Sequence, residues 1–146
     1  MMQEPEGIFR VGASSDHSVQ LFDTPESLGE AVASFLAEGL EGGGRLLVAA
    51  RAASVWEVSR ALADRGISMS ELVTSGRLTV VDAHATLRAL LRDERPERAL
   101  FEAHVGDLVA RLSAGSPAPL RIYGELVEIL AEEGNFAGAA ALEDLW

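Results

Sequence analysis

Strand and helix signals alternate along the chain from His17 onward, and this alternation restricts the fold more than any other feature. Within the segment 45–50 every residue after Arg45 is apolar, as expected for a strand that is covered on both faces, and amphipathic helical segments precede and follow it. Such alternation is typical of βαβ units, in which helices connect parallel strands. We therefore predict an α/β fold, a three-layer sandwich with a mostly parallel central sheet.

The predicted elements follow from apolar spacing and from residues that begin or end helices. Short aliphatic runs predict strands at 18–22, 45–50, 78–81 and 120–123, with a further short strand at 8–11. Thr24 and Asp82 are expected to cap the helices that follow them, and Ser54 with Glu57 to form a capping box. Further helices are predicted at 83–92, from 96 to beyond 112, after Glu125, and at 136–146. Residues 1–16 are interpreted as a leader, and 17–146 as one domain.

Charge excludes several classes of partner. The chain has 23 acidic and 12 basic residues, a formal net charge of −11, and every basic residue is arginine. A surface this negative repels phosphate backbones and anionic lipid headgroups, so we expect no contact with nucleic acid or membrane. No apolar run approaches the roughly 20 residues of a membrane span, and the acidic N-terminus lacks signal-peptide character. A cytoplasmic location is the expectation.

Catalytic and metal-binding signatures are missing from the sequence. The segment 23–27 after the first predicted strand holds two carboxylates, no glycine and no lysine, so it does not resemble a Walker A phosphate loop. There is no cysteine, no H-E-x-x-H pair and no G-x-S-x-G nucleophile elbow. His104 is interpreted as a buried or half-buried helix residue rather than a ligand. We expect no enzymatic activity, no metal and no cofactor.

Candidate ligand-binding residues come from the rule that open parallel sheets bind ligands beyond the carboxyl ends of their strands. Tyr123, Gly124 and Glu125 attract most interest, because they place a polar aromatic, a glycine and a carboxylate together at that edge. Glu125 could equally be an ordinary first-turn helix residue, and Arg77 a surface arginine. The full candidate set is His17, Asp23, Arg77, Asp82, Tyr123 and Glu125.

Five short blocks follow one another along the chain: 17–23, 38–40 with Gly42, 76–78 with Asp82, 121–125, and 132–135 followed by 142–146. In this order they resemble the MEDS domain, the sensory domain named for methanogens, methylotrophs and the DcmR regulator. The resemblance implies a fold related to the RecA/KaiC core without its phosphate loop. It also implies attachment to histidine-kinase, anti-sigma-type or DNA-binding output modules, and small organic molecules as inputs. Phe22 departs from the family, which often has tyrosine there, and the family pattern usually runs a few residues beyond Trp146.

Two hypotheses of function remain open on the sequence alone. The first is a non-enzymatic sensory domain in signal transduction or transcription regulation, which binds a small organic ligand at the sheet edge and shifts the packing of the last helix. The alternative is a protein–protein interaction or dimerisation module without a small ligand. In that case the last helix would offer an apolar surface made of Phe136, Leu142, Leu145 and Trp146.

Overall fold

The computed structural model describes residues 24–146, and a three-stranded parallel sheet lies at its centre. The strand order is β2 (Leu78–Asp82), β1 (Leu46–Ala50), β5 (Arg121–Gly124), with Leu46 paired to Leu78 on one side and to Arg121 on the other. The predicted strands 45–50, 78–81 and 120–123 are thus confirmed to within one residue at each end. The predicted strands at 8–11 and 18–22, together with His17 and Asp23, lie outside the described residues.

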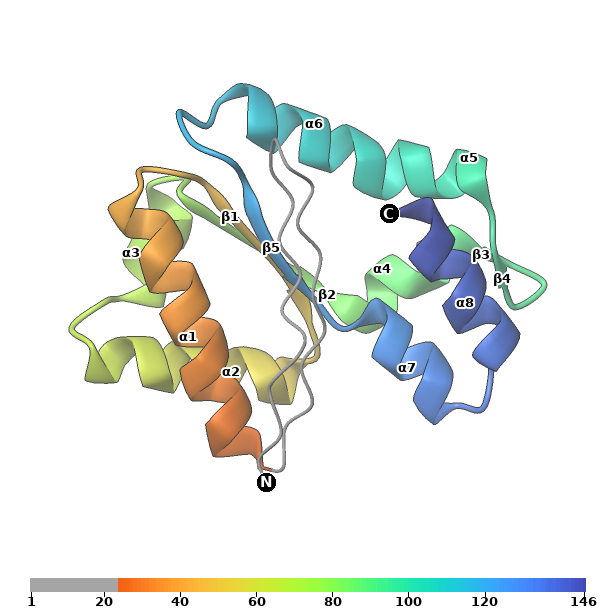
Figure 1. Ribbon diagram of the computed structural model, residues 1–146, viewed down its shortest axis with the longest axis horizontal. Helices are drawn as coiled ribbons and strands as arrows, with labels where there is room; N and C mark the ends of the chain where they lie inside the picture. The colour runs from red at the N-terminus through yellow and green to blue at the C-terminus, as the bar shows by residue number, and fades with distance from the viewer. Residues whose placement is uncertain (1–23) are drawn as a thin grey trace.

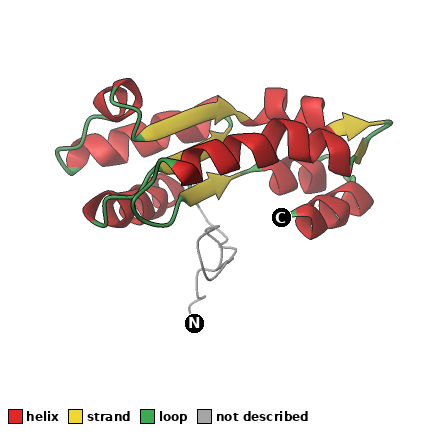
Figure 2. Ribbon diagram, turned by 90° about the horizontal axis from the view of Figure 1, so that it is seen from above, coloured by secondary structure: helices red, strands yellow, loops and turns green. Residues whose placement is uncertain are grey.

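Helices cover both faces of this sheet, which confirms the three-layer α/β architecture (Figures 1 and 2). On one face α1 (Pro25–Glu41) and α2 (Ala52–Asp64) bury their apolar stripes against Leu46, Val48 and Ala50 of β1. On the other face, α6 (Asp107–Ala114) packs against Leu47 and its neighbours. Since successive residues of a strand point to opposite faces, the fully apolar sequence of β1 follows from its central position. The short helix α3 (Met69–Thr74) precedes β2.

A second apolar core lies beyond the carboxyl ends of the strands. Here β2 leads directly into α4 (Ala83–Leu90), and β5 leads through one residue into α7 (Leu126–Glu132), which is followed by α8 (Phe136–Leu145). These helices form a lobe to the right of the sheet in Figure 1 and share a core with α5 (Arg98–Phe101). The edge at which ligands were expected is therefore largely covered by helices.

The predicted long helix from residue 96 is interrupted by a π-helical turn. It consists of α5, the π turn η1 (Glu102–Gly106) and α6. Phe101 and Val105 are buried as the apolar spacing predicts, but His104 is exposed. The wider turn places more residues per revolution than an α-helix, so it rotates His104 away from the face of Phe101. The interpretation of His104 as a buried or half-buried residue is wrong.

Two further boundaries differ from the prediction. The helix predicted at 83–92 ends at Leu90, because the chain turns into a small hairpin of β3 (Leu91–Arg92) and β4 (Arg95–Pro96). Its tight turn places Asp93 and Glu94 in the left-handed region, with φ of 54° and 64°. The predicted Ser54 capping box is also wrong, because α2 begins at Ala52 and Arg51 holds the N-cap position.

Two predicted caps, by contrast, are confirmed. Thr24 Oγ1 accepts a hydrogen bond from the Ser27 N–H, and Asp82 Oδ2 accepts one from the Ala85 N–H at 2.7 Å. Both contacts satisfy backbone donors that the first turn of a helix leaves without an intrahelical partner.

Candidate functional site

The connection from β1 to α2 consists of one residue, Arg51, and that residue contacts the helical lobe. Its backbone N–H donates to Glu125 Oε1 at 2.8 Å, and its Nε donates to the same oxygen at 3.0 Å. Glu125 is fully buried, at 0% exposure, and it sits between β5 and α7. Because Arg51 and Glu125 are 74 residues apart in the sequence, this contact joins the central strand to the start of the lobe.

Tyr123 completes the coordination of this buried carboxylate. Its hydroxyl donates to Glu125 Oε2 at 2.7 Å, so both carboxylate oxygens accept hydrogen bonds. Burial, followed by the charge of Glu125 and the hydrogen bond to it, raises the pKa of Tyr123 far above its ordinary value of 10.0. The two residues on which the sequence analysis placed most weight therefore do contact each other. They form a satisfied internal network rather than an open rim.

Two further carboxylates from α7 surround the Arg51 guanidinium. Nη1 lies 2.8 Å from Glu132 Oε1, and Nη2 lies 3.5 Å from Glu128 Oε1. Burial alone lowers the pKa of Arg51, but the hydrogen bond to Glu125 and the charges of Glu125 and Glu132 raise it overall. Burial and the neighbouring charge of Glu125 raise the pKa of Glu128, against the opposing effect of Arg51. We call this group of five residues, Arg51, Tyr123, Glu125, Glu128 and Glu132, the Arg51 cluster.

The strand-end rule also places Arg51 on this rim, but the candidate set omitted it, although two further signals pointed to it. A charged residue directly follows a fully apolar strand, and three glutamates recur on one face of the helix after β5.

The short connection between β1 and α2 also bears on phosphate binding. A Walker A loop needs several residues with glycines between strand and helix, whereas β1 and α2 are separated by Arg51 alone. The N–H of Arg51 binds the Glu125 carboxylate.

Asp82 and Arg77 lie at opposite ends of β2. Asp82 pairs in register with Ala50, so it is at the carboxyl edge of the sheet, on the other side of β1 from Glu125. Arg77 precedes β2 and donates from Nη2 to the Leu40 carbonyl oxygen at 3.0 Å, at the amino-terminal edge. The structure thus brings Asp82, Tyr123 and Glu125 to one edge but not Arg77.

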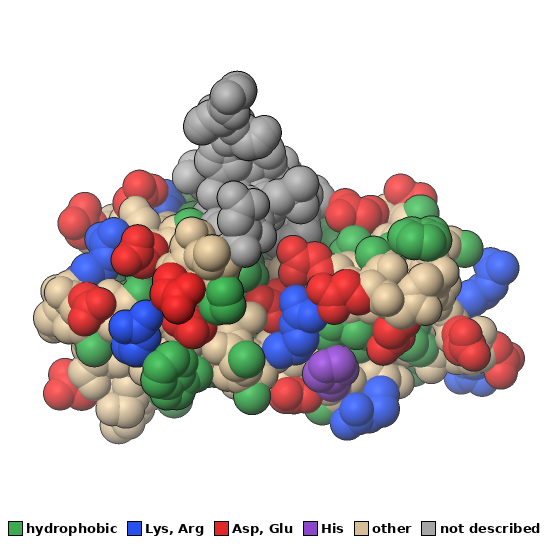
Figure 3. Space-filling view, turned by 90° about the horizontal axis from the view of Figure 1, so that it is seen from below, with side chains coloured by type: hydrophobic (Ala, Val, Ile, Leu, Met, Phe, Trp, Pro, Cys, Tyr) green, Lys and Arg blue, Asp and Glu red, His purple; other side chains and the backbone are tan. Residues whose placement is uncertain are grey.

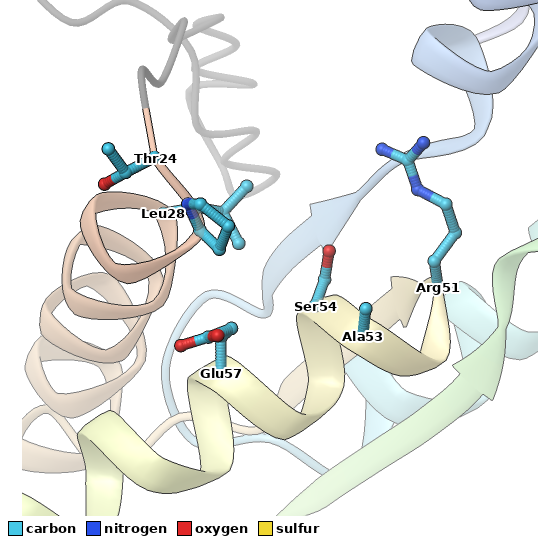
Figure 4. Close-up of a pocket in the computed structure, with 7 residues that line it drawn as sticks. Thr24, Leu28, Arg51, Ala53, Ser54 and Glu57 are labelled. Atoms are coloured by element: carbon cyan, nitrogen blue, oxygen red, sulfur yellow. The ribbon is translucent and has the colours of Figure 1, made fainter.

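A pocket of about 480 Å³ lies between the first turns of α1 and α2 (Figure 4). In that view Leu28 of α1 faces Ala53 and Ser54 of α2 across the cavity, and Arg51 stands at one end. The Arg51 side chain is 29% exposed, and its guanidinium is engaged by three carboxylates. The other polar side chains on its wall are those of Thr24, Ser54 and Glu57, and the buried Glu57 Oε1 has no hydrogen-bond partner among the described residues.

A second pocket, of about 390 Å³, lies on the face of the sheet opposite α1 and α2; we call it the sheet-face pocket. Its walls come from all three strands, from α4, from the π turn and α6, and from the ends of α7 and α8. Asp82, Thr86 and His104 supply the polar side chains, and Trp146 the largest aromatic. The remaining lining residues are Leu47, Ala49, Val81, Ala85, Ala89, Val105, Leu108, Ile122 and Leu126.

Within residues 24–146 no cluster of three or more histidine, aspartate or glutamate side chains is arranged to hold a metal ion. Over the same part of the chain, no helix combines the length and apolar character needed to cross a membrane.

Comparison with known proteins identifies a family over nearly the whole chain. Residues 16–146 match the family model described as the MEthanogen/methylotroph, DcmR Sensory domain, MEDS. Neither a curated protein nor a solved structure is significantly similar to the chain. The match covers every described element and includes the blocks on which the resemblance was based, so the chain belongs to the MEDS family of sensory domains.

Proposed function

We propose that this sensory domain binds a small organic molecule in the sheet-face pocket and passes the signal on through the helical lobe. The observation that carries the proposal is the composition of the pocket wall, in which aliphatic side chains dominate and three polar side chains are added. A volume of about 390 Å³ falls in the range of small-molecule sites, which are mostly apolar with a few polar groups that orient the ligand.

The position of the pocket supports coupling between ligand and lobe. Leu126 begins α7, Asp82 caps α4, and Trp146 follows α8, so a ligand there would contact the ends of three lobe helices. The Trp146 ring packs edge-on against Phe101, with centroids 5.3 Å apart, and keeps 36% exposure. A ligand transmits a signal only if it binds one arrangement of these helices better than another.

Tryptophan fluorescence provides a direct test. The chain has two tryptophans, and Trp56 lies outside the pocket with an exposed side chain, so Trp56→Phe leaves Trp146 as the sole reporter. In this background we expect small organic ligands to shift Trp146 emission in a saturable manner. Ala89→Leu, which fills the pocket, should abolish the shift.

Two matched leucine variants serve as controls. Ala110→Leu adds the same volume to an exposed position of α6 and should leave binding intact. Ala53→Leu fills the pocket beside Arg51 instead. Binding that survives Ala89→Leu and disappears with Ala53→Leu would move the site to that other pocket and refute the proposal.

The apolar surface that a dimerisation module would need on α8 is only partly exposed. Leu142 is fully buried in the core of the lobe, and Leu145 is half-buried, so the predicted apolar surface of α8 is not available as a whole. Phe136, at 69% exposure, is its most exposed member.

A further inference from the structure

We infer that the ligand of the sheet-face pocket carries a positively charged head group, such as a protonated amine, which pairs with Asp82. This inference rests on the proposed function, because it specifies the chemical class of the ligand for the same pocket.

The formal charge on the pocket wall is negative. Among its thirteen lining residues, Asp82 is the one with a formal charge when histidine is counted as neutral, and no arginine contributes. An anionic ligand would meet this carboxylate with no cation among the lining residues to offset it. A cation would gain an ion pair and a charge-assisted hydrogen bond.

The Asp82 carboxylate can accept further hydrogen bonds. Its Oδ2 accepts the Ala85 N–H at the first turn of α4, and we find no ion pair to it within residues 24–146. An ionised carboxylate has about four lone-pair sites, so one helix-capping bond does not saturate it. The same bond satisfies one N–H of the first α4 turn, and the negative charge of Asp82 offsets the positive end of the helix dipole, which would otherwise favour an anion.

The charge of the rest of the molecule also favours cations. The chain has a formal net charge of −11, and acidic side chains spread over most of the face in Figure 3, with arginines scattered among them. A negative protein concentrates cations near its surface and depletes anions. The aliphatic walls then select an alkyl or cycloalkyl body rather than a bare inorganic cation.

Three probes with the same ring separate charge from shape: cyclohexylamine, cyclohexanol and cyclohexanecarboxylate, each titrated at pH 7 and low salt with Trp146 as reporter. We expect the ammonium form to bind about two- to fivefold more tightly than the alcohol, a modest preference because Asp82 is exposed and solvent partly screens its ion pair. The carboxylate should bind most weakly. Added salt should lower the affinity for the amine and leave the affinity for the alcohol unchanged.

Asp82→Asn is the decisive variant, since asparagine caps a helix as well as aspartate and removes only the charge. It should reduce the affinity for the amine to that for the alcohol, while the alcohol affinity stays constant. Equal binding of amine and alcohol to the wild type, both lost with Ala89→Leu, would overturn the cationic head group and leave the proposed function standing. An amine preference that persists in Asp82→Asn would overturn the role of Asp82. Absence of binding by all three probes would overturn the proposed function itself.

Discussion

Substitution of Glu125 by alanine removes the carboxylate that joins β1, β5 and α7. The Tyr123 hydroxyl and the Arg51 backbone N–H both lose their acceptor, and the Arg51 Nε loses its nearest partner. Glu125 is the one fully buried charged side chain among the described residues. Its replacement therefore leaves buried donors unsatisfied and opens a cavity at the junction of sheet and lobe.

The expected loss of stability can be built from these contacts. A buried donor left without a partner costs about 1–3 kcal/mol, and breaking a buried ion pair costs about 3–5 kcal/mol. Arg51 retains its ion pairs with Glu132 and Glu128, and its side chain is 29% exposed. Both facts reduce the contribution of the broken Arg51–Glu125 pair to the loss of stability. We expect Glu125→Ala to lower the free energy of unfolding by about 3–4 kcal/mol, equivalent to about 10 °C in Tm for a chain of this length.

Urea unfolding followed by circular dichroism measures this quantity, with two companion variants. Tyr123→Phe removes the 2.7 Å hydrogen bond alone and should cost about 1–2 kcal/mol. Glu132→Ala removes an ion pair at the surface and should change stability by less than about 1 kcal/mol. A Glu125→Ala protein within about 1 kcal/mol of the wild type, or an equal loss in Glu132→Ala, would refute the view that the buried carboxylate holds the lobe to the sheet.

Three further predictions concern single residues. Tyr123 is the one tyrosine of the chain, and its pKa is raised in the folded protein. Absorbance at the phenolate band should therefore appear only where alkali unfolds the protein, and the free energy of unfolding should fall above pH 10. Reversible titration of the native protein near pH 10 would contradict this. The raised pKa of Glu128 means that ionisation of this carboxyl opposes folding as the pH rises above 4.5. Glu128→Gln should therefore have a higher urea midpoint than the wild type at pH 7 and the same midpoint near pH 4. A lower midpoint at pH 7 would refute the expected direction of the effect. A Cβ at Gly29 would lie 2.7 Å from the Glu57 carbonyl oxygen, so Gly29→Ala should lower the free energy of unfolding by about 1–3 kcal/mol. A Cβ at Gly106 has more space, so Gly106→Ala should be neutral or stabilising. Equal changes in Tm for the two variants would exclude close packing of α1 on α2.

Local patterns were sufficient for most elements of the fold. The continuous apolar run at 46–50 and the stripe of Val32, Leu36 and their neighbours depend only on spacing, and both appear in the structure as predicted. The helix end at Leu90 could not be predicted, since Asp93 and Glu94 adopt positive φ without a glycine to indicate it. The π turn that exposes His104 likewise has no sequence signal in its apolar spacing.

The candidate site was predictable only in part, for a different reason. Position at the carboxyl edge follows from topology, and this rule correctly gathered Asp82, Tyr123 and Glu125 at one edge. Which side chains are engaged there depends on contacts between segments more than 70 residues apart, such as Arg51 with Glu125. Spacing within a segment carries no information on such contacts, so the sequence analysis could not distinguish an open rim from a closed network.

The order of strands in the sheet has a consequence for synthesis of the protein. β1 pairs with β2 after about thirty residues of intervening chain, but its other neighbour, β5, is made much later, with Leu46 opposite Arg121. Until Glu125 has left the ribosome, one edge of the central strand has unpaired backbone N–H and C=O groups, and Arg51 lacks its buried carboxylate. Distant pairings of this kind slow folding and leave nascent chains open to association. The segment from Arg121 to Trp146 thus completes the sheet as well as the helical lobe, and a nascent chain halted before it would be a substrate for chaperones.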